Sequence, residues 1–273
     1  MSSKMLKKIS VVKKMTDKKS YRRMIGGVVR KQKKHFRHDA FGKRRLRNVD
    51  RAKKFVRYLF RNKPEVLTQL DIDNLTIDQS AYMDNRFRRS YSDIVYRIPL
   101  CGGGEFVLTI LIELKSQSSF LTMWQMTDYI VVGIWKDEFE LVNNAARGVN
   151  ADAKSRLRLK NFLFPTVVPV IFHFGRRKFS APTELVKLVH TIDGLGENVL
   201  NMKAMLIDMV SLQEDEEPQD LDLWATFKAF QMVFSDDPEK CLREIFDRML
   251  PEIGSPIVLE SWWEILDYAR YSA

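Results

Sequence analysis

The sequence has few cysteines and no long hydrophobic run, and both shortages limit what the chain can be. Cys101 and Cys241 are far apart and form no CxxC pair, so the sequence indicates neither a disulfide framework nor a cysteine-based zinc site. The longest apolar stretch, residues 106–112, is too short to span a bilayer. The N-terminus has lysines but lacks the apolar segment of a signal peptide. We therefore expect a cytoplasmic protein with no membrane partner.

Charge is abundant and unevenly distributed along the 273 residues, whose net charge is +10. Residues 1–63 contain 24 lysines and arginines against three aspartates, a net charge of +21. The remaining residues contain 21 basic and 32 acidic side chains, a net charge of −11. Such a basic block attracts polyanions through counterion release, and nucleic acid is the commonest polyanion in a cell. The alternatives are a solvated lysine tail and a segment that contacts a membrane surface.

The pattern of apolar residues divides the chain into three parts. Residues 1–34 have weak periodicity and many like charges, which predicts an arm that stays mobile until a partner neutralises it. Residues 35–180 are expected to form the core domain and residues 181–273 a helical C-terminal region. The core opens with one or two amphipathic helices that have a basic outer face, because one helical stripe carries Phe41, Val49, Ala52, Phe55, Val56 and Leu59.

Three strands are predicted next, at about residues 73–82, 91–100 and 106–115. The last two are separated only by "CGGGE", which is short enough for a hairpin. A helix at about 121–141 precedes a buried strand, "FPTVVPVIFHFG", that ends near Gly175. The long helical connection predicts that this strand runs parallel to the third, after a right-handed crossover. Beyond residue 180 we expect only helices, at 183–212, 221–234, 239–250 and 257–271.

Charged side chains stand in the predicted hairpin where a buried strand should be apolar. Glu113 and Lys115 share one face of their strand, about 6–7 Å apart, because alternate residues point the same way. With the turn near Gly103, residues whose numbers sum to about 206 pair across the hairpin, which places Asp93 opposite Glu113. Two carboxylates would then meet at one end of the sheet, beside an ammonium group. An exposed salt bridge between Glu113 and Lys115 is the alternative reading.

Two carboxylates held close together repel each other, and a divalent cation removes that conflict. Hard oxygen ligands suit Mg²⁺, with Mn²⁺ as an alternative ion, and the backbone carbonyl of Leu114 is a candidate third ligand. The metal would polarise a phosphate and activate a bound water. Lys115 would orient or deprotonate that water, or stabilise the charge that develops on phosphorus. This pattern predicts a site for phosphodiester hydrolysis, with Asp93, Glu113 and Lys115 as the catalytic residues.

The chain resembles the recombination-promoting nuclease (Rpn) family, whose members are also called YhgA-like transposases. The resemblance covers about residues 35–235 and rests on five segments in the family's order: "HDAFGKRRL", "YSDIVYRI", "LIELKSQSS", "VVPVIFHFG" and "MLIDMVSLQEDE". It implies an α/β fold with a PD-(D/E)xK nuclease-like core, in which an α-β-β-β-α-β order builds a mixed four-stranded sheet flanked by helices, followed by an all-helical C-terminal extension. It also implies metal-dependent DNA cleavage, with Asp93, Glu113 and Lys115 at the motif positions.

The sequence departs from the family pattern at two positions. Family members often have glutamine in place of Lys115, and the strand that usually ends in Tyr-His-Gly here reads His173-Phe174-Gly175. His173 ends an apolar strand and is expected to be a satisfied interior histidine. His35 and His38, at the start of the first helix, are expected to be surface residues.

Further residues are expected to assist the site or to bind DNA. Supporting contacts are predicted for Asp39, Gln117 and Gln125, and phosphate contacts for Lys43, Arg44, Arg45 and Arg47 together with the N-terminal arm. Cutting both strands of a duplex favours a homodimer. The competing function is a catalytically inactive DNA-binding or protein-interaction protein with the same fold.

Overall fold

The computed structural model describes residues 36–78, 82–83, 89–90, 94–102, 107–115, 117–148, 152–190 and 198–272. Side chains are described for all of these except residues 36, 37, 39, 82, 83, 89, 90, 107–111, 113, 271 and 272. The described chain divides into two compact units. Residues 46–173 and 179–208 form a sheet unit, and residues 36–45, 174–178 and 209–272 form a helical unit.

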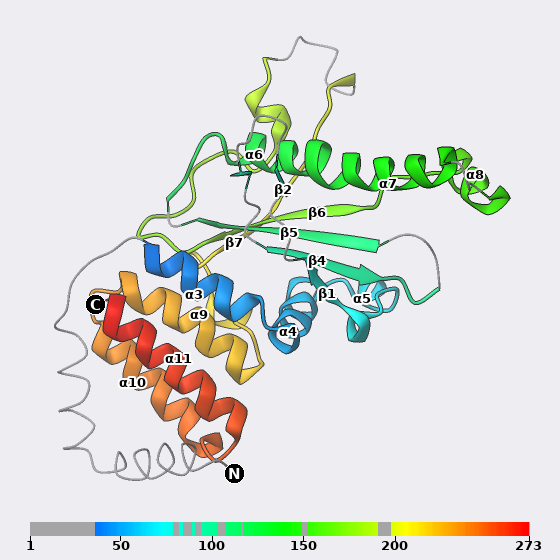
Figure 1. Cartoon of the computed structure of the whole chain (residues 1–273). Helices are drawn as coiled ribbons and strands as arrows, with labels where there is room; N and C mark the ends of the chain where they lie inside the picture. The colour runs from blue at the N-terminus through cyan, green and yellow to red at the C-terminus, as the bar shows by residue number, and fades with distance from the viewer. Residues whose placement is uncertain are drawn as a thin grey trace. The chain divides into compact units, whose positions relative to one another are not determined.

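A mixed five-stranded sheet is the centre of the sheet unit (Figure 1). Its spatial order is β1-β4-β5-β6-β7, with β4 antiparallel to its neighbours and β5, β6 and β7 parallel to one another. The mixed α/β class and the parallel crossover to the strand before Gly175 are thus confirmed, but a sheet of four strands was too few. The strands are β1 (Thr76–Asp78), β4 (Ile94–Pro99), β5 (Val107–Lys115), β6 (Val167–His173) and β7 (Met205–Asp208).

The hairpin register agrees with the one that the glycine cluster predicts. Ile94 lies opposite Ile112 and Pro99 opposite Val107, so paired residue numbers sum to 206 throughout β4 and β5. This register decides which side chains share a face of the sheet, because residues directly opposite each other point the same way.

The fifth strand, β7, corrects the expectation that residues 183–212 are helical. Among the described residues of this stretch, the structure has a 3₁₀ turn at Leu185–Leu188 and then β7, which pairs in parallel with β6. A four-residue strand at the edge of a sheet is defined by its long-range partner, whereas its own leucine and methionine residues are equally compatible with a helix. The other three predicted C-terminal helices are present.

One face of the sheet packs against α4 (Val49–Leu59), which follows α3 (Phe36–Leu46) as the second of the two predicted basic helices. The Phe55 ring lies 6.4 Å from Tyr96 and 6.2 Å from Phe172, centroid to centroid. The Tyr96 hydroxyl donates to the Leu46 carbonyl at 2.6 Å, and burial raises the pKa of this tyrosine. The predicted apolar stripe is buried apart from Val49, which is 43% exposed.

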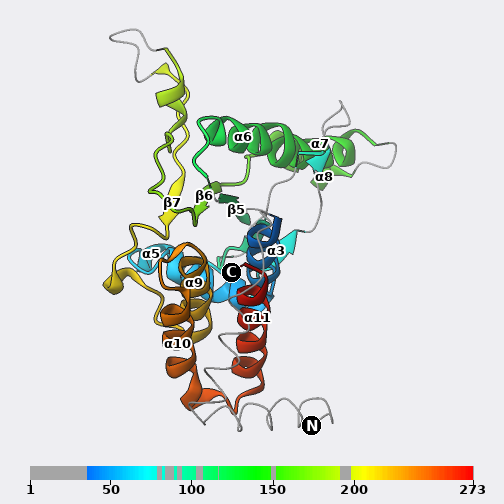
Figure 2. The same ribbon diagram turned by 90° about the vertical axis from the view of Figure 1, so that its left-hand side faces the viewer.

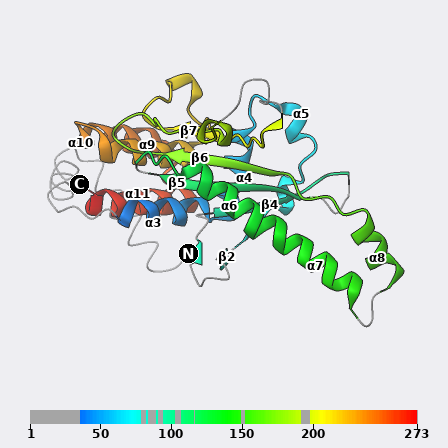
Figure 3. The same cartoon turned by 90° about the horizontal axis from the view of Figure 1, so that it is seen from above.

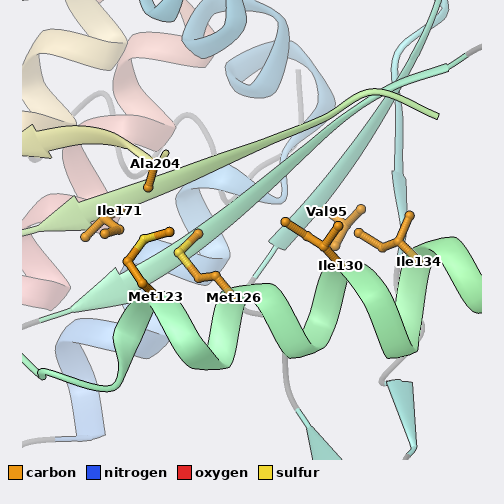
Figure 4. Packing of buried hydrophobic residues seen from close by; sticks show 7 residues of the cluster. All are labelled: Val95, Met123, Met126, Ile130, Ile134, Ile171 and Ala204. Carbon is orange, nitrogen blue, oxygen red and sulfur yellow. The ribbon is translucent and has the colours of Figure 1, made fainter. Parts of the chain in front are cut away.

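The opposite face of the sheet packs against a long helical rod (Figure 3). The rod consists of α6 (Thr122–Asp128), a π-helical segment (Tyr129–Trp135) and α7 (Lys136–Arg147). Figure 4 shows its buried cluster, in which side chains of the rod meet those of the strands and of Ala204. The members are Val95, Met123, Met126, Ile130, Ile134, Ile171 and Ala204. This arrangement assigns the face that carries Val95 and Ile171 to the rod.

The helical unit contains three helices that lie alongside one another, α9, α10 and α11 (Figure 2). Their bounds are Leu221–Phe234, Pro238–Met249 and Pro256–Ser272. The first described helix, α3, also belongs to this unit up to residue 45. Aspartates 220 and 237 accept from backbone amides at the starts of α9 and α10, which satisfies otherwise unpaired helix donors.

The remaining elements are short. The structure has helices α5 (Pro64–Leu67) and α8 (Ala153–Lys160), a β2–β3 pair (Tyr82–Met83 with Arg89–Ser90), and 3₁₀ turns at Ile72–Asn74, Glu214–Glu216 and Leu250–Glu252. The first of these turns lies where the predicted strand 73–82 was expected to begin. Within the described ranges, no helix is long and apolar enough to cross a bilayer.

The buried cluster of Figure 4 gives a direct test of the packing. We expect Ile171→Ala to lower the free energy of unfolding by about 2–5 kcal/mol, because the side chain is fully buried and its loss leaves a cavity. Leu163→Ala, at a side chain that is 65% exposed, should change it by about 0.5 kcal/mol at most. Urea titrations followed by circular dichroism give both values. Equal losses of unfolding free energy in the two variants would contradict this packing.

Candidate active site

Three polar side chains stand in one row where β5, β6 and β7 end. The strand register aligns Lys115 with His173, and His173 with Asp208. In parallel strands, residues aligned in this way point to the same face of the sheet. The row therefore lies on the face that carries Ile171 and packs against α6. The carboxyl ends of parallel strands are a common position for ligand sites in α/β proteins.

Glu113 stands on β5 two residues before Lys115, and its backbone pairs with Ile171. Its side chain is outside the described set, and Asp93 lies outside the described residues altogether. The pairing of Asp93 with Glu113 thus stays a prediction. The side chains that the structure does describe include no group of three histidines, cysteines, aspartates or glutamates placed to hold a metal ion.

Lys115 is the predicted catalytic residue whose side chain the structure places. The side chain is partly buried, and its Nζ atom lies 3.4 Å from Oε1 of Gln125 on α6. The structure thus brings together two of the predicted residues. Gln117 is exposed just after β5, where no hydrogen bond joins it to another described side chain. The Leu114 side chain is buried toward the opposite face, and the role of its carbonyl as a ligand is untested.

His173 and Asp208 form a buried pair in this row. The His173 Nδ1 atom lies 2.9 Å from Oδ1 of Asp208, and both side chains are largely shielded from solvent. The backbone amide of Phe179 donates to the second oxygen of Asp208 at 3.0 Å. His173 is thus interior and hydrogen-bonded, as predicted. Sequence reasoning missed Asp208, although "MLID" is an apolar run that ends in an acid, as "LTILIE" does in β5.

The segment "HDAF" at the start of α3 forms packing contacts in the helical unit. His38 is buried, and its Nδ1 atom lies 2.7 Å from the Tyr268 hydroxyl. The Phe41 ring stacks on Tyr268 with centroids 3.9 Å apart, and it meets Phe230 edge-on at 5.3 Å. The expectation of a surface position was therefore wrong for His38. His35 and the side chain of Asp39 lie outside the described set.

Arg45 is a structural residue, which corrects its prediction as a DNA contact. Its side chain is fully buried in the helical unit, so a phosphate cannot reach it. The guanidinium donates to carboxylate oxygens of Asp222 and Glu264. It also donates to the hydroxyls of Thr226 and Ser261. The five N–H donors of an arginine are well matched to such a ring of acceptors.

The other three predicted DNA-contacting residues remain accessible to different degrees. Arg44 has a side chain that is 64% exposed and forms an ion pair with Glu264 at 3.0 Å. Arg47 is exposed and Lys43 is half-buried. Phosphate contacts by these three side chains stay a prediction.

The buried arginine generates a stability prediction. We expect Arg45→Met to lower the free energy of unfolding by about 3–5 kcal/mol, because it leaves the carboxylates of Asp222 and Glu264 buried with less compensation. The matched variant Arg44→Met removes an exposed ion pair and should cost about 1 kcal/mol or less. Urea titration of both proteins measures the difference. A small effect of Arg45→Met would show that the buried ion pairs are not required for the helical unit.

Comparison with known proteins places the chain in a family. The chain is 28% identical over 138 residues to the recombination-promoting nuclease RpnA of Escherichia coli (strain K12). That match covers 50% of this chain but only 40% of the relative, so the chain spans less than half of the relative's length. No solved structure gives a significant match. The family model described as "Putative transposase, YhgA-like" matches residues 36–252, and the chain therefore belongs to the family of that description.

Proposed function

We propose that the protein is a metal-dependent DNA endonuclease with a PD-(D/E)xK core. The observation that carries the proposal is the end of β5, where Glu113 and Lys115 share a face of a central strand. The hairpin register through Ile94 and Ile112 supports a meeting of Asp93 with Glu113, since one further step of that register joins these two positions. The family membership and the relative named as a nuclease support the same class of function.

The donor set fits a hard divalent cation. Two carboxylates, from Asp93 and Glu113, and the backbone carbonyl of Leu114 are oxygen ligands of the kind that Mg²⁺ and Mn²⁺ accept. When bound, the ion would polarise the scissile phosphate and lower the pKa of a water molecule. Without it, two facing carboxylates in one strand pair would destabilise the sheet. We therefore assign Asp93 and Glu113 to the binding of the metal.

Lys115 is proposed to act on the water and the phosphate. Its ammonium group is anchored near Gln125 on α6, which limits the rotamers of a side chain that is otherwise flexible. From this position it would orient the attacking water and stabilise the negative charge that develops on phosphorus. Gln125 is then a positioning residue for Lys115, and Asp39 and Gln117 are left as candidates for supporting contacts.

DNA is the proposed substrate, held largely through its phosphates. The basic arm of residues 1–34 and the side chains of Lys43, Arg44 and Arg47 would supply contacts that do not depend on base sequence. Arg45 is left out of this set because its guanidinium is buried. A homodimer would let two such sites cut the two strands of one duplex, and the cytoplasm is the proposed location.

Nicking of supercoiled plasmid DNA tests the catalytic assignment. We expect the wild-type chain to nick in Mg²⁺ or Mn²⁺ and to stop in EDTA. Asp93→Asn and Glu113→Gln should each lower the rate by about 100-fold or more, because loss of a metal ligand removes a large stabilisation of the transition state. The rate constants come from gel quantification over time.

The control is Asp236→Asn, which removes an exposed carboxylate from the helical unit and should leave the rate unchanged. Binding of DNA in EDTA should be the same for all four proteins within about twofold, since the two metal-binding carboxylates do not attract phosphates. Wild-type nicking by Asp93→Asn would refute the assignment. Absence of nicking in the wild-type chain would favour the inactive DNA-binding alternative.

A further inference from the structure

A short loop after β6 carries three consecutive cations. Arg176, Arg177 and Lys178 are all exposed, and no hydrogen bond or ion pair joins their side chains to another described residue. Adjacent like charges repel one another, so a run of three without an acidic partner does not stabilise the fold. A role in binding an anion would explain the run. The basic run of the sequence ends at residue 63, so this loop is a separate concentration of positive charge.

The ends of this loop are held by a single carboxylate. Oδ1 of Asp208 binds the ring of His173, the last residue of β6, at 2.9 Å. Oδ2 of the same side chain accepts from the amide of Phe179, the first residue after the cations, at 3.0 Å. The Phe179 ring meets His173 edge-on, with centroids 5.3 Å apart. We call His173, Asp208 and Phe179 the clasp.

The clasp restricts the loop before any ligand arrives. Only residues 174–178 lie between its two anchored ends, and the amide of Ser180 is also held, by the hydroxyl of Ser118 at 3.0 Å. A short chain whose ends are held in this way has less backbone freedom than an open one. Binding through the three cations then costs less conformational entropy than binding through a mobile tail.

Covalent geometry limits the distance between the first of the cations and the last residue of β6. Three residues separate His173 from Arg176, and a fully extended chain advances at most about 3.6 Å per residue. The Cα atom of Arg176 therefore lies within about 11 Å of that of His173. Since His173 is aligned with Lys115, the loop leaves the sheet at the edge where β5 also ends.

We propose that Arg176, Arg177 and Lys178 bind the phosphate backbone of DNA, and that the clasp positions them for it; this inference rests on the proposed function. Guanidinium groups donate two parallel hydrogen bonds to a phosphate, which suits the two arginines. An anionic membrane surface would attract the same charges. However, Phe174 is buried and Phe179 packs on His173, so the loop offers no aromatic side chain for insertion into lipid.

The test is the equilibrium binding of the full chain to a fluorescein-labelled DNA duplex in EDTA, at several salt concentrations. The variant has Arg176→Gln, Arg177→Gln and Lys178→Gln together. We expect its affinity to fall by about tenfold or more, and the slope of log K against log salt to decrease by about two to three, close to one per lost phosphate contact.

A matched control removes the same charge from α8 through Lys154→Gln, Arg156→Gln and Lys160→Gln, three exposed side chains of the sheet unit. Its affinity should change by less than about threefold, as expected for long-range screening alone. Equal losses in both triple variants would mean that net charge decides binding and would overturn the proposal. An unchanged affinity in the loop variant would overturn it too. Loss of binding to phosphatidylserine vesicles without loss of DNA binding would instead assign the loop to a membrane.

Hydrogen exchange tests the positioning role of the clasp separately. Asp208→Ala should accelerate hydrogen exchange at the amides of Phe179 and Ser180 and weaken DNA binding in EDTA, whereas Asp236→Ala should do neither. Unchanged exchange and affinity would contradict the positioning role. Binding in EDTA needs no cutting, so these results are independent of the nicking assay. An unchanged affinity in the loop variant would leave the catalytic assignment intact. Failure of the nicking assay would likewise leave the binding role of the loop intact.

Discussion

The alternation of side chains along β5 is the constraint on which the proposed chemistry depends. Ile112 and Leu114 are buried, and strand alternation assigns them to the face of α4 and positions 113 and 115 to the other face. Glu113 and Lys115 occupy those positions. A shift of the strand register by one residue would exchange the apolar and charged positions between the two faces and bury both charged residues against α4. The buried apolar side chains of β5 thus fix the positions of Glu113 and Lys115 in the sheet.

Parallel neighbours extend this constraint across the sheet. β6 and β7 end beside β5, and each ends in a polar residue, His173 or Asp208. We assign two different roles to the residues of the row that they form. Lys115 belongs to the proposed site of hydrolysis, whereas His173 and Asp208 are buried and hold the loop of residues 174–178. Packing against the α6 rod covers the apolar part of the same face, so polar side chains are concentrated at its end.

Local patterns predicted much of this architecture. The glycine cluster predicted the hairpin register, the long helical connection predicted the parallel β5–β6 pair, and the helical stretches beyond residue 180 predicted α9, α10 and α11. Non-local pairing was not predictable in the same way. The partners of Arg45 lie 177 and 219 residues away, so in the sequence this side chain looks like one more surface cation. β7 is likewise defined by β6 rather than by its own residues. In the candidate site, Gln125 was predicted only as a supporting residue, and the structure places it 3.4 Å from Lys115; Asp208 was missed because its strand was.

Asp93 and Glu113 are proposed to share one metal ion at the end of the β4–β5 hairpin. The most direct measurement is an anomalous difference map from crystals of the full chain grown with Mn²⁺. We expect a peak within direct coordination distance of carboxylate oxygens of both residues, absent in crystals of Glu113→Gln. Side chains of Asp93 and Glu113 on opposite faces of the sheet, or a manganese ion bound elsewhere and none between them, would contradict it.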